Sequence, residues 1–200
     1  MAQPTDTGPF LDFLLSRRSA ASLVEPGPSP AQLAQILRST ATAPDHGQMR
    51  PFRLVVIEGE GRKAFGRALA AAAGERRPGL SPEKAAGIAA KAMRSPTSIV
   101  LIASPREGKA ETWEQHATAA CAGYAVVLAA AAVGVGAVWK SVPFTRGKAL
   151  SALFGMTDTE DMFGWIHLGT AANEASSGER PGLDVSAITT VIDRDDQPAG

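Results

Sequence analysis

The chain has 200 residues, of which 44% are hydrophobic, and its 20 basic and 20 acidic side chains leave no formal net charge. This length predicts one domain, and the charge balance excludes the strongly basic surface typical of a nucleic-acid binder. The single cysteine, Cys121, excludes an intramolecular disulfide framework and a cysteine-based zinc site. We therefore expect a protein of a reducing compartment, the cytoplasm, with no nucleic-acid partner.

The sequence predicts one folded unit. Helix and strand signals interleave along the chain, and no polar linker is long enough to separate two domains. We expect a disordered arm over residues 1–9, a single domain over residues 10–192 and a loose tail over residues 193–200. The arm lacks the basic, apolar and small-residue order of a secretory signal.

Helix and strand signals follow one another in chain order. We expect helices over residues 10–16, from Pro30, over 61–73, from Pro82 and over 146–154, strands over 53–57, 98–103, 137–140 and 164–168, and a mobile loop over 74–82. Ser29-Pro30 and Ser81-Pro82 each place an N-cap serine before a proline at the first helical position. The strands are unbroken apolar runs, which predict a sheet covered on both faces.

A charge-free run of 23 residues, 117–139, is long enough in principle to cross a membrane. Ten of these residues are alanine, and Gly134 and Gly136 break a helix near the end of the run. We therefore expect a buried helix and no membrane association. Small side chains such as Ala119 and Gly123 suit close packing, either within the chain or against a second subunit.

Residues 186–192 are β-branched and predict a strand, although a polar stretch over 173–182 separates them from the other strands. The backbone groups of such a strand must pair with the chain's own sheet or with the sheet of a second subunit. We favour pairing with a second subunit.

The first candidate binding segment is Arg17-Arg18-Ser19, at the end of a short predicted helix. Two guanidinium groups and a hydroxyl are suited to holding a phosphate. The same tripeptide often occurs by chance, so a solvated helix terminus is the alternative interpretation.

The second candidate is the loop over residues 43–52, which contains Asp45-His46. Its prolines and glycine restrict the backbone, so the loop can present His46 to a ligand. An Asp45–His46 catalytic pair is the alternative, but adjacent side chains rarely face each other and no nucleophile motif accompanies them. Hydrogen bonding within the loop is the simplest interpretation.

The third candidate covers residues 134–141, where the long helix ends and a strand begins. Trp139 offers a flat apolar surface and Lys140 a positive charge for an electron-rich ring, whereas the simpler interpretation is a helix stop followed by a core tryptophan. The glycine spacing is not a dinucleotide-binding fingerprint, because it closes a helix instead of opening one.

Several other residues attract less functional interest. His116 and His167 lie far from His46 and have no spaced carboxylate partner, so we expect no metal site. Cys121 and Tyr124 are three residues apart on the long helix, so they share a face and are expected to pack.

Taken together and in this order, the segments resemble the small subgroup of the flavin-dependent nitroreductase family. The resemblance covers about residues 10–172. It rests on residues 17–19, on residues 43–46 leading through Pro51 and Phe52 into residues 55–62, on Trp113-Glu114-Gln115, on Trp139-Lys140-Ser141 and on Leu168-Gly169-Thr170. Each motif alone is nonspecific, whereas the ordered set is specific.

The resemblance implies an α+β, three-layer fold with a central mixed, mainly antiparallel sheet flanked by helices. It also implies a homodimer with exchanged terminal segments and two FMN molecules at the subunit interface. NADH or NADPH would be the co-substrate.

Carried over by position, Arg17, Arg18 and Ser19 would hold the FMN phosphate and the polar edge of the flavin ring. Lys140 would lie beside the isoalloxazine, and Lys140 and Arg18 would supply positive charge near N1 and O2 of the reduced flavin.

Trp139 and Ser141 would also border the isoalloxazine, while Thr42 and His46 would contact the flavin bound mainly by the other chain. The chain departs from the subgroup pattern, which has arginine at the positions of Thr42 and Lys140. Many relatives also carry a lysine where this chain has Ala21.

The implied activity is that of an FMN-dependent NAD(P)H oxidoreductase acting on nitroaromatic, quinone-like or other electron-poor small molecules by ping-pong hydride transfer through flavin N5. No catalytic side chain is expected, because the flavin carries the chemistry. The alternatives are a relative that performs dehalogenation, ene reduction or flavin breakdown, and a non-catalytic FMN-binding or storage protein.

Overall fold

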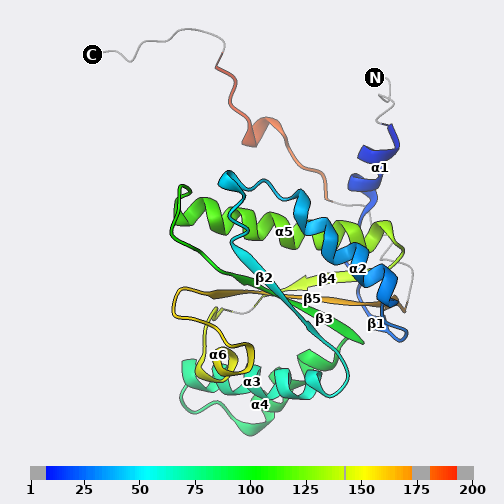
Figure 1. The fold of residues 1–200 in the computed structure, drawn as a ribbon. Helices are drawn as coiled ribbons and strands as arrows, with labels where there is room; N and C mark the ends of the chain where they lie inside the picture. The colour runs from blue at the N-terminus through cyan, green and yellow to red at the C-terminus, as the bar shows by residue number, and fades with distance from the viewer. Residues whose placement is uncertain (1–7, 142, 173–180, 193–200) are drawn as a thin grey trace.

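A five-stranded sheet separates two layers of helices (Figure 1). The computed structural model describes residues 8–141, 143–172 and 181–192. Its strands are β1 (Leu23–Val24), β2 (Phe52–Ile57), β3 (Thr97–Ala103), β4 (Gly136–Lys140) and β5 (Asp161–Ala171). The four strands predicted between residues 53 and 168 are therefore confirmed, and β1 is an addition that the sequence did not predict.

The longest strand, β5, organises the sheet. It pairs with β1, β3 and β4, and β3 in turn pairs with β2. All of these pairs are antiparallel, so within the described residues the sheet contains no parallel pair. Every residue of β3 is buried, as expected for a strand covered on both faces.

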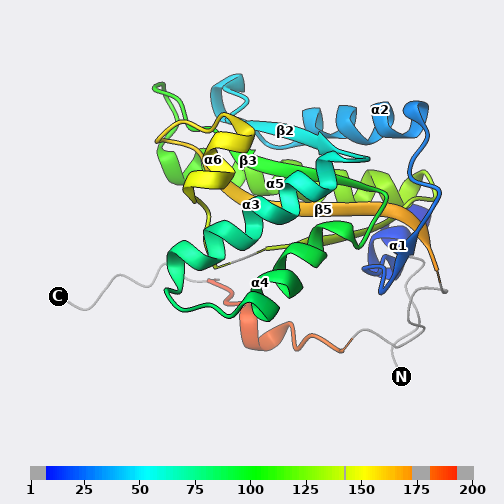
Figure 2. The same ribbon diagram turned by 90° about the horizontal axis from the view of Figure 1, so that it is seen from below.

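The helices form the two outer layers. They are α1 (Gly8–Ser16), α2 (Pro30–Arg38), α3 (Gly61–Arg76), α4 (Pro82–Ala89), α5 (Thr112–Ala132) and α6 (Lys148–Phe154), with short 3₁₀ turns η1 (Ser39–Thr42), η2 (His46–Gln48), η3 (Ala90–Met93) and η4 (Ser186–Ile188). Helices α2 and α5 cover one face of the sheet, and α3, α4 and α6 cover the other (Figures 1 and 2). The three-layer α+β fold is confirmed.

Local sequence signals explain where two of these helices begin. Ser29 Oγ accepts a hydrogen bond from the Gln32 amide at 3.3 Å, and Gln32 Oε1 accepts one from the Ser29 amide at 2.9 Å. Ser81 Oγ accepts from the Lys84 amide in the same way. Each serine satisfies an amide that the first helical turn leaves without an intrahelical partner. Helix α3 runs on to Arg76, so the loop predicted over 74–82 is shorter than expected.

The sheet has a hydrophobic cluster on each face. The cluster beneath it joins α3 and α6 to the sheet through Phe65, Leu69, Leu150, Val100, Ile102 and Trp165. The cluster above it joins α2 and α5 to the sheet through Ile36, Val126, Ala130, Ile99, Ile166 and Leu168. The core therefore lies on both sides of β3 and β5.

Helix α5 has 21 residues and is long and apolar enough to be a candidate membrane span by length and composition alone. In the structure it lies along the sheet, and Val126 and Ala130 on its inner face are fully buried. This arrangement agrees with the predicted core helix. The helix ends where the glycines predict, because the chain leaves it after Ala132 and turns at Gly134, whose φ is +75°.

The strand predicted over residues 186–192 is wrong for this chain. Residues 186–188 form η4, residues 189–192 make no strand pair, and the whole segment is exposed. Asp184 explains the difference, because its Oδ1 accepts hydrogen bonds from the amide of Ser186 at 3.0 Å and from its hydroxyl at 2.6 Å. This local turn competes with an extended backbone.

The predicted N-terminal arm and C-terminal tail lie mostly outside the residues that the structure describes. The expected arm falls on residues 1–7, outside the described residues, and on Gly8 and Pro9, which begin α1. The expected tail over 193–200 also lies outside the described residues.

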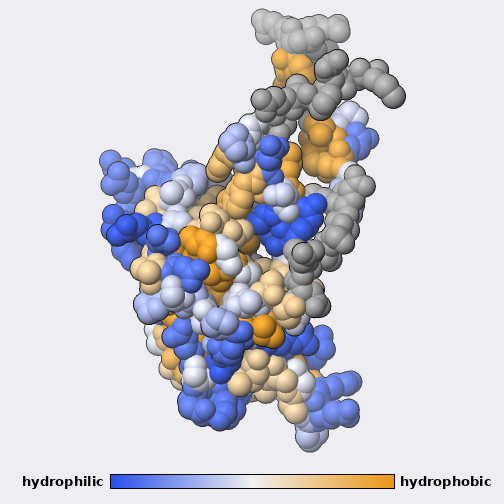
Figure 3. Space-filling model, turned by 90° about the vertical axis from the view of Figure 1, so that its right-hand side faces the viewer, coloured by the Kyte–Doolittle hydropathy of each residue, from blue (hydrophilic) through white to orange (hydrophobic). Residues whose placement is uncertain are grey.

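Helix α1 stands away from the three layers (Figure 1). Its side chains Phe10 and Leu15 are 72% and 55% exposed, respectively. Figure 3 shows apolar side chains, in orange, on this projecting upper part of the molecule. Exposed large apolar residues of this kind commonly mark a surface that another chain covers.

An ion pair ties β2 to the start of β5. Arg53 Nε and Nη2 donate to the two carboxylate oxygens of Glu160 at 2.7 and 2.9 Å, and Nη2 also donates to the Phe154 carbonyl. The Glu160 side chain is only 5% exposed. The hydrogen bond from Arg53 lowers the pKa of Glu160 from 4.5 to about 2, although burial acts in the opposite direction. The folded state therefore favours the ionised carboxylate.

Replacing Glu160 should make the stability of the protein less dependent on pH. A carboxyl group with a lowered pKa stabilises the fold above pH 4.5, and this contribution is lost as the pH falls toward 2. We expect Glu160→Gln to reduce the free energy of unfolding at pH 7 by about 2–4 kcal/mol, the scale for removing one partner of a buried ion pair. Urea denaturation followed by tryptophan fluorescence at pH 7 and pH 3 measures this.

The control is Glu60→Gln, which removes the exposed partner of Lys63 and should leave stability close to that of the unmodified protein. At pH 3 the gap between Glu160→Gln and the unmodified protein should narrow. A gap that stays equally large at both pH values would contradict the role given to the Glu160 charge.

Candidate functional site

The segment Arg17-Arg18-Ser19 connects α1 to β1 and runs beside β4. The Arg17 amide donates to the Phe13 carbonyl, and three residues later the Ala20 amide donates to the Ala137 carbonyl of β4 at 3.0 Å. The segment is therefore held between the end of α1 and the first residues of β4.

Arg18 is turned toward α1. Its Nη1 donates to the Leu15 carbonyl at 2.7 Å and to the Arg17 carbonyl at 3.1 Å. A guanidinium group in this place satisfies carbonyls that the last helical turn leaves without partners. Arg17 is half-buried and Ser19 is exposed.

A cavity of about 380 Å³ opens directly after this segment, under β4; we call it the β4 cavity. Its lining residues are Ala20, Ala21, Ser22, Leu23, Met93, Arg94, Val138, Lys140 and His167. Val138 and Lys140 point to the same face of β4, and the β4–β5 register places Val138 opposite His167. The structure thus brings Lys140 next to the residues that follow Ser19.

The β4 cavity is positively charged. Arg94 and Lys140 contribute two cations, and none of the described residues that line the cavity carries a carboxylate. The register fixes the place of Lys140 by pairing it with Trp165. Gly164 helps, because a Cβ at that position would overlap the Lys140 carbonyl oxygen and because its φ of +119° disfavours other residues.

His167 forms the buried wall of this cavity and is 2% exposed. Its Nε2 accepts a hydrogen bond from Trp165 Nε1 at 2.7 Å, and its Nδ1 lies 2.7 Å from Ser95 Oγ and 3.0 Å from Ser98 Oγ. Burial lowers the pKa of His167 from 6.5 to about 4, with further lowering by the charges of Lys140 and Arg94. The imidazole is therefore neutral near pH 7.

Trp139 lies on the opposite face of β4 from Lys140. Its ring lies so close to Gly123 of α5 that a Cβ at Gly123 would overlap it, and its Nε1 donates to the Phe163 carbonyl at 3.2 Å. Trp139 is thus part of the upper core, and toward the β4 cavity it can offer only backbone groups. Ser141 follows β4 and is exposed.

Thr42 and His46 lie in the layer of α2 and α5, and neither lines the β4 cavity. Thr42 ends η1, and its hydroxyl donates to the Ser39 carbonyl. His46 begins η2, and its Nδ1 is 2.9 Å from Glu114 Oε2 on the first turn of α5. Within one chain, these two residues are separated from the segment over 17–19.

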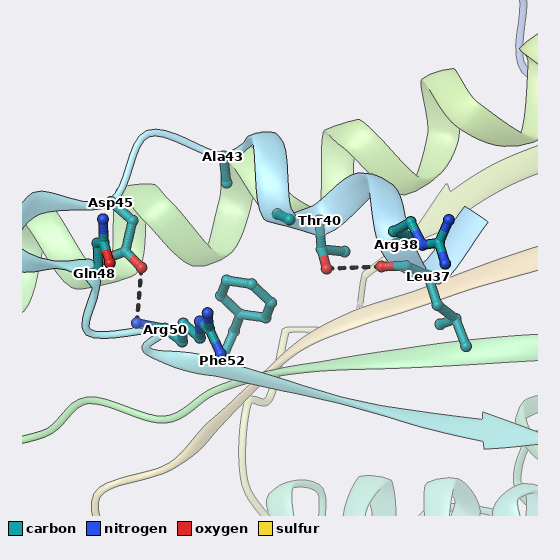
Figure 4. A pocket seen from close by; sticks show the side chains of 9 residues that line it. Leu37, Arg38, Thr40, Ala43, Asp45, Gln48, Arg50 and Phe52 are labelled. Atoms are coloured by element: carbon teal, nitrogen blue, oxygen red, sulfur yellow. Dashed lines mark hydrogen bonds between the residues drawn. The ribbon is translucent and has the colours of Figure 1, made fainter. Parts of the chain in front are cut away.

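The pair Asp45–His46 does not form. Asp45 accepts a hydrogen bond from the amide of Met49 at 3.0 Å and another from the amide of Arg50 at 2.8 Å, the second of which Figure 4 shows. These bonds hold Gln48 and Arg50 at φ values of +53° and +48°, which non-glycine residues seldom adopt. Hydrogen bonding within the loop, the simplest interpretation of the sequence, is thus the role of Asp45.

A larger cavity of about 680 Å³ lies between α2, this loop and the start of β2 (Figure 4). Its lining residues are Leu37, Arg38, Thr40, Ala41, Ala43, Asp45, Gln48, Arg50 and Phe52. None of the residues that the resemblance assigns to the flavin lines it. The β4 cavity is therefore the better candidate for the site, although it is the smaller of the two.

The outer face of α5 is largely uncovered. Cys121 is exposed and Tyr124 is 48% exposed, so neither is buried within its own chain. Both line a shallow, mostly apolar depression together with Pro44 and Leu128. Small side chains keep this face smooth, and it adjoins the loop that carries His46.

The sequence alone did not identify Arg94 and His167 as site residues. Arg94 stands between η3 and the fully buried β3, and a lone cation at that position gave no signal. His167 was considered only as a metal ligand. Among the residues that the structure describes, no three His, Cys, Asp or Glu side chains are placed to hold a metal ion together.

Sequence comparison adds independent information. A model of the nitroreductase family matches residues 14–170. The chain is 40% identical over 172 residues to a protein of Escherichia coli (strain K12) with the provisional name NAD(P)H nitroreductase YdjA, an alignment that covers 84% of this chain and 91% of YdjA. It is also 34% identical to a Haemophilus influenzae protein with a similar provisional name, over 82% of this chain and 90% of that protein.

Solved structures with the same fold include a nitroreductase-like protein from Bacillus cereus, with a TM-score of 0.78 and 21% identity, covering 96% of this chain and 100% of that one. Another comes from Desulfovibrio desulfuricans and was solved in complex with FMN; its TM-score is 0.70 and its identity 22%, over 92% of this chain and 97% of that one. At these identities the solved structures show the fold alone. The family model and the 40% identity to YdjA show which family the chain belongs to. The chain belongs to the nitroreductase family.

Proposed function

We propose that the protein passes electrons from NADH or NADPH, through FMN, to nitroaromatic, quinone-like or other electron-poor small molecules. The observation that carries the proposal is the β4 cavity, whose described lining has two cations and no carboxylate and which adjoins Arg17-Arg18-Ser19. A cavity of this kind favours a ligand with a negatively charged, planar part.

As a member of the nitroreductase family, the chain is an oxidoreductase that uses FMN and NAD(P)H. The residues present are compatible with FMN. The β4 cavity falls within the roughly 300–1,000 Å³ range usual for cofactor sites. Its charge suits the flavin ring when reduced, and the neighbouring arginines suit a phosphate.

In the proposed site, Arg17 and Ser19 hold the phosphate, and Lys140 lies beside the flavin ring. Arg18 supports the segment from behind, because one of its terminal nitrogens is bonded to carbonyls of α1 and Arg17. Trp139 contributes backbone groups, since its ring is packed against α5, and the exposed Ser141 completes the border.

When bound, FMN supplies the two-electron chemistry, taking a hydride equivalent from NAD(P)H and delivering it to the acceptor. The contribution of the chain is orientation and charge. Lys140 stabilises negative charge that develops on the reduced ring. The serines bonded to His167, Ser95 and Ser98, do not line the cavity, so the described lining offers no nucleophile–base pair, which suits a reaction that needs none.

We also propose that the protein is a homodimer. Three observations support a second copy: the uncovered face of α5, the exposed apolar residues of α1, and the exposed segment 181–192 with Val191 at 78% and Ile192 at 86%. Thr42 and His46 lie away from the β4 cavity of their own chain, so a partner would be required for them to contact a flavin. The cytoplasm remains the proposed compartment.

Purified protein should be yellow. NADH or NADPH added without oxygen should bleach the flavin absorbance, and a nitroaromatic compound should restore it. Restoration by a halogenated compound or an activated alkene in place of nitroaromatics would favour the alternative reactions. Colour without bleaching would favour a storage protein.

Arg17→Ala should weaken FMN binding. The loss of one charged hydrogen bond corresponds to about 1.5–3 kcal/mol in binding free energy. Quenching of FMN fluorescence on titration with apoprotein measures the change, and Arg67→Ala, which removes an exposed arginine of α3, is the matched control. Equal FMN affinity in the Arg17 and Arg67 variants would remove Arg17 from the phosphate site.

Removing all residues after Ala172 should weaken the homodimer, because the segment over 181–192 leaves its apolar side chains exposed on its own chain. Sedimentation velocity over a range of concentrations measures the dissociation constant of the dimer. A full-length chain that sediments as a monomer, with or without FMN, is incompatible with the homodimer and with the roles of Thr42 and His46.

A further inference from the structure

The charge of the β4 cavity depends on three side chains: Arg94, Lys140 and His167. Arg94 reaches the cavity from the end of η3, where its amide donates to the Lys91 carbonyl. Within the described chain, the Arg94 guanidinium makes no hydrogen bond or ion pair. It therefore differs from Arg53, which is neutralised by Glu160, and from Arg18, which is bonded to carbonyls of α1 and Arg17.

Hydrogen bonding determines which form His167 takes. Trp165 Nε1 is a donor only, so His167 Nε2, 2.7 Å away, has to be the acceptor. The ring proton is then on Nδ1, which faces Ser95 Oγ and Ser98 Oγ. The hydroxyl proton of Ser95 is donated to the Thr97 carbonyl at 2.8 Å. Ser95 Oγ is therefore free to accept the hydrogen bond from the Nδ1–H group of His167. Both ring nitrogens are satisfied only in the neutral ring.

A second proton on His167 would point its Nε2–H at the indole N–H of Trp165. The charged groups facing the ring act in the same direction: Arg94 from the end of η3 and Lys140 from β4 both repel an imidazolium. Further out, Arg62 of α3 donates to the Ser95 carbonyl, and Glu58 accepts from Thr97 Oγ1. Among the residues that the structure describes, no carboxylate bonds to His167 to offset the repulsion.

We propose that Arg94 is a further cofactor-binding residue of this site, and that burial together with the hydrogen bond from Trp165 keeps His167 neutral, so that Arg94 and Lys140 alone set the charge facing the flavin ring. This inference rests on the proposed function. His167 is then a positioning residue. Both of its ring nitrogens are occupied by hydrogen bonds, so neither takes part in proton transfer. The two permanent cations stabilise the anionic edge of the reduced ring equally well across the neutral pH range.

The expectation from the sequence was that Arg18 would share this role with Lys140. The structure favours Arg94 instead, because Arg94 lines the cavity and Arg18 does not. Ala21, which also lines the cavity, brings no charge of its own. Arg94 therefore supplies the second cation from a segment that is distant in the sequence.

The role of Arg94 is tested by comparing Arg94→Gln, Arg94→Lys and the surface control Arg67→Gln. Arg94→Gln should raise the dissociation constant of reduced FMN about tenfold more than that of oxidised FMN, the scale of one charged hydrogen bond. For a two-electron couple, that factor makes the midpoint potential of bound FMN about 30 mV more negative. Arg94→Lys should restore most of the difference, and Arg67→Gln should show none.

The state of His167 is tested in apoprotein, without FMN. Nitrogen NMR of the histidine side chains should show the Nδ1–H form of His167 unchanged from pH 8 to pH 5. In Trp165→Phe the ring loses its obligatory donor and should begin to protonate within this interval. Trp139→Phe, which removes an indole N–H on the other face of β4, should leave the His167 signals unchanged.

The outcomes separate this inference from the proposed function. A His167 signal that titrates above pH 6 in the unmodified protein overturns the inference whether or not FMN binds, and this measurement needs no variant. Unchanged potential and affinities in Arg94→Gln overturn the role of Arg94. Failure of the unmodified protein to bind FMN, with His167 still neutral, instead removes the proposed function and with it the assignment of Arg94.

Discussion

The antiparallel register between β4 and β5 is the constraint on which the site depends. It places Val138 opposite His167 and Lys140 opposite Trp165, all on the lower face of the sheet. A shift of one residue would turn Lys140 into the upper core and Trp139 out of it. The register is secured from both sides, because Trp165 and Ile166 are buried in the clusters below and above β5.

This arrangement explains how a chain without net charge can contain a strongly positive cavity. Two acidic groups near the sheet form ion pairs away from the cavity: Glu160 pairs with Arg53, and Asp161 pairs with Arg146 at 2.9 Å. Arg94 and Lys140 face the cavity without such partners, and His167 adds no charge. A negatively charged ligand is the partner that such a cavity favours, and in the proposed function that ligand is reduced FMN.

The structure also divides the expected flavin contacts between two places. Lys140 lines the β4 cavity and the segment over 17–19 adjoins it, whereas Thr42 and His46 lie in the layer above the sheet. Asp45 stiffens the His46 loop through bonds to the amides of Met49 and Arg50, and Glu114 orients the imidazole. A rigid loop beside the uncovered face of α5 suits presentation of His46 to a second chain.

Sequence by itself determined the elements whose signals are local. The N-caps at Ser29 and Ser81, the apolar runs of β2 to β5 and the glycine stop after α5 act through the backbone of their own neighbourhood, and the ordered motifs indicated the family. The strand predicted over 186–192 failed for a local reason too, since Asp184 stabilises a turn that β-branched residues alone do not reveal. Tertiary structure decided the rest. The register of β4 on β5 brings Lys140 and His167 together beside Arg94. Burial, the charges of Lys140 and Arg94, and the hydrogen bond from Trp165 together keep the histidine neutral. These effects depend on how the folded chain brings the groups together, which no local sequence signal reveals.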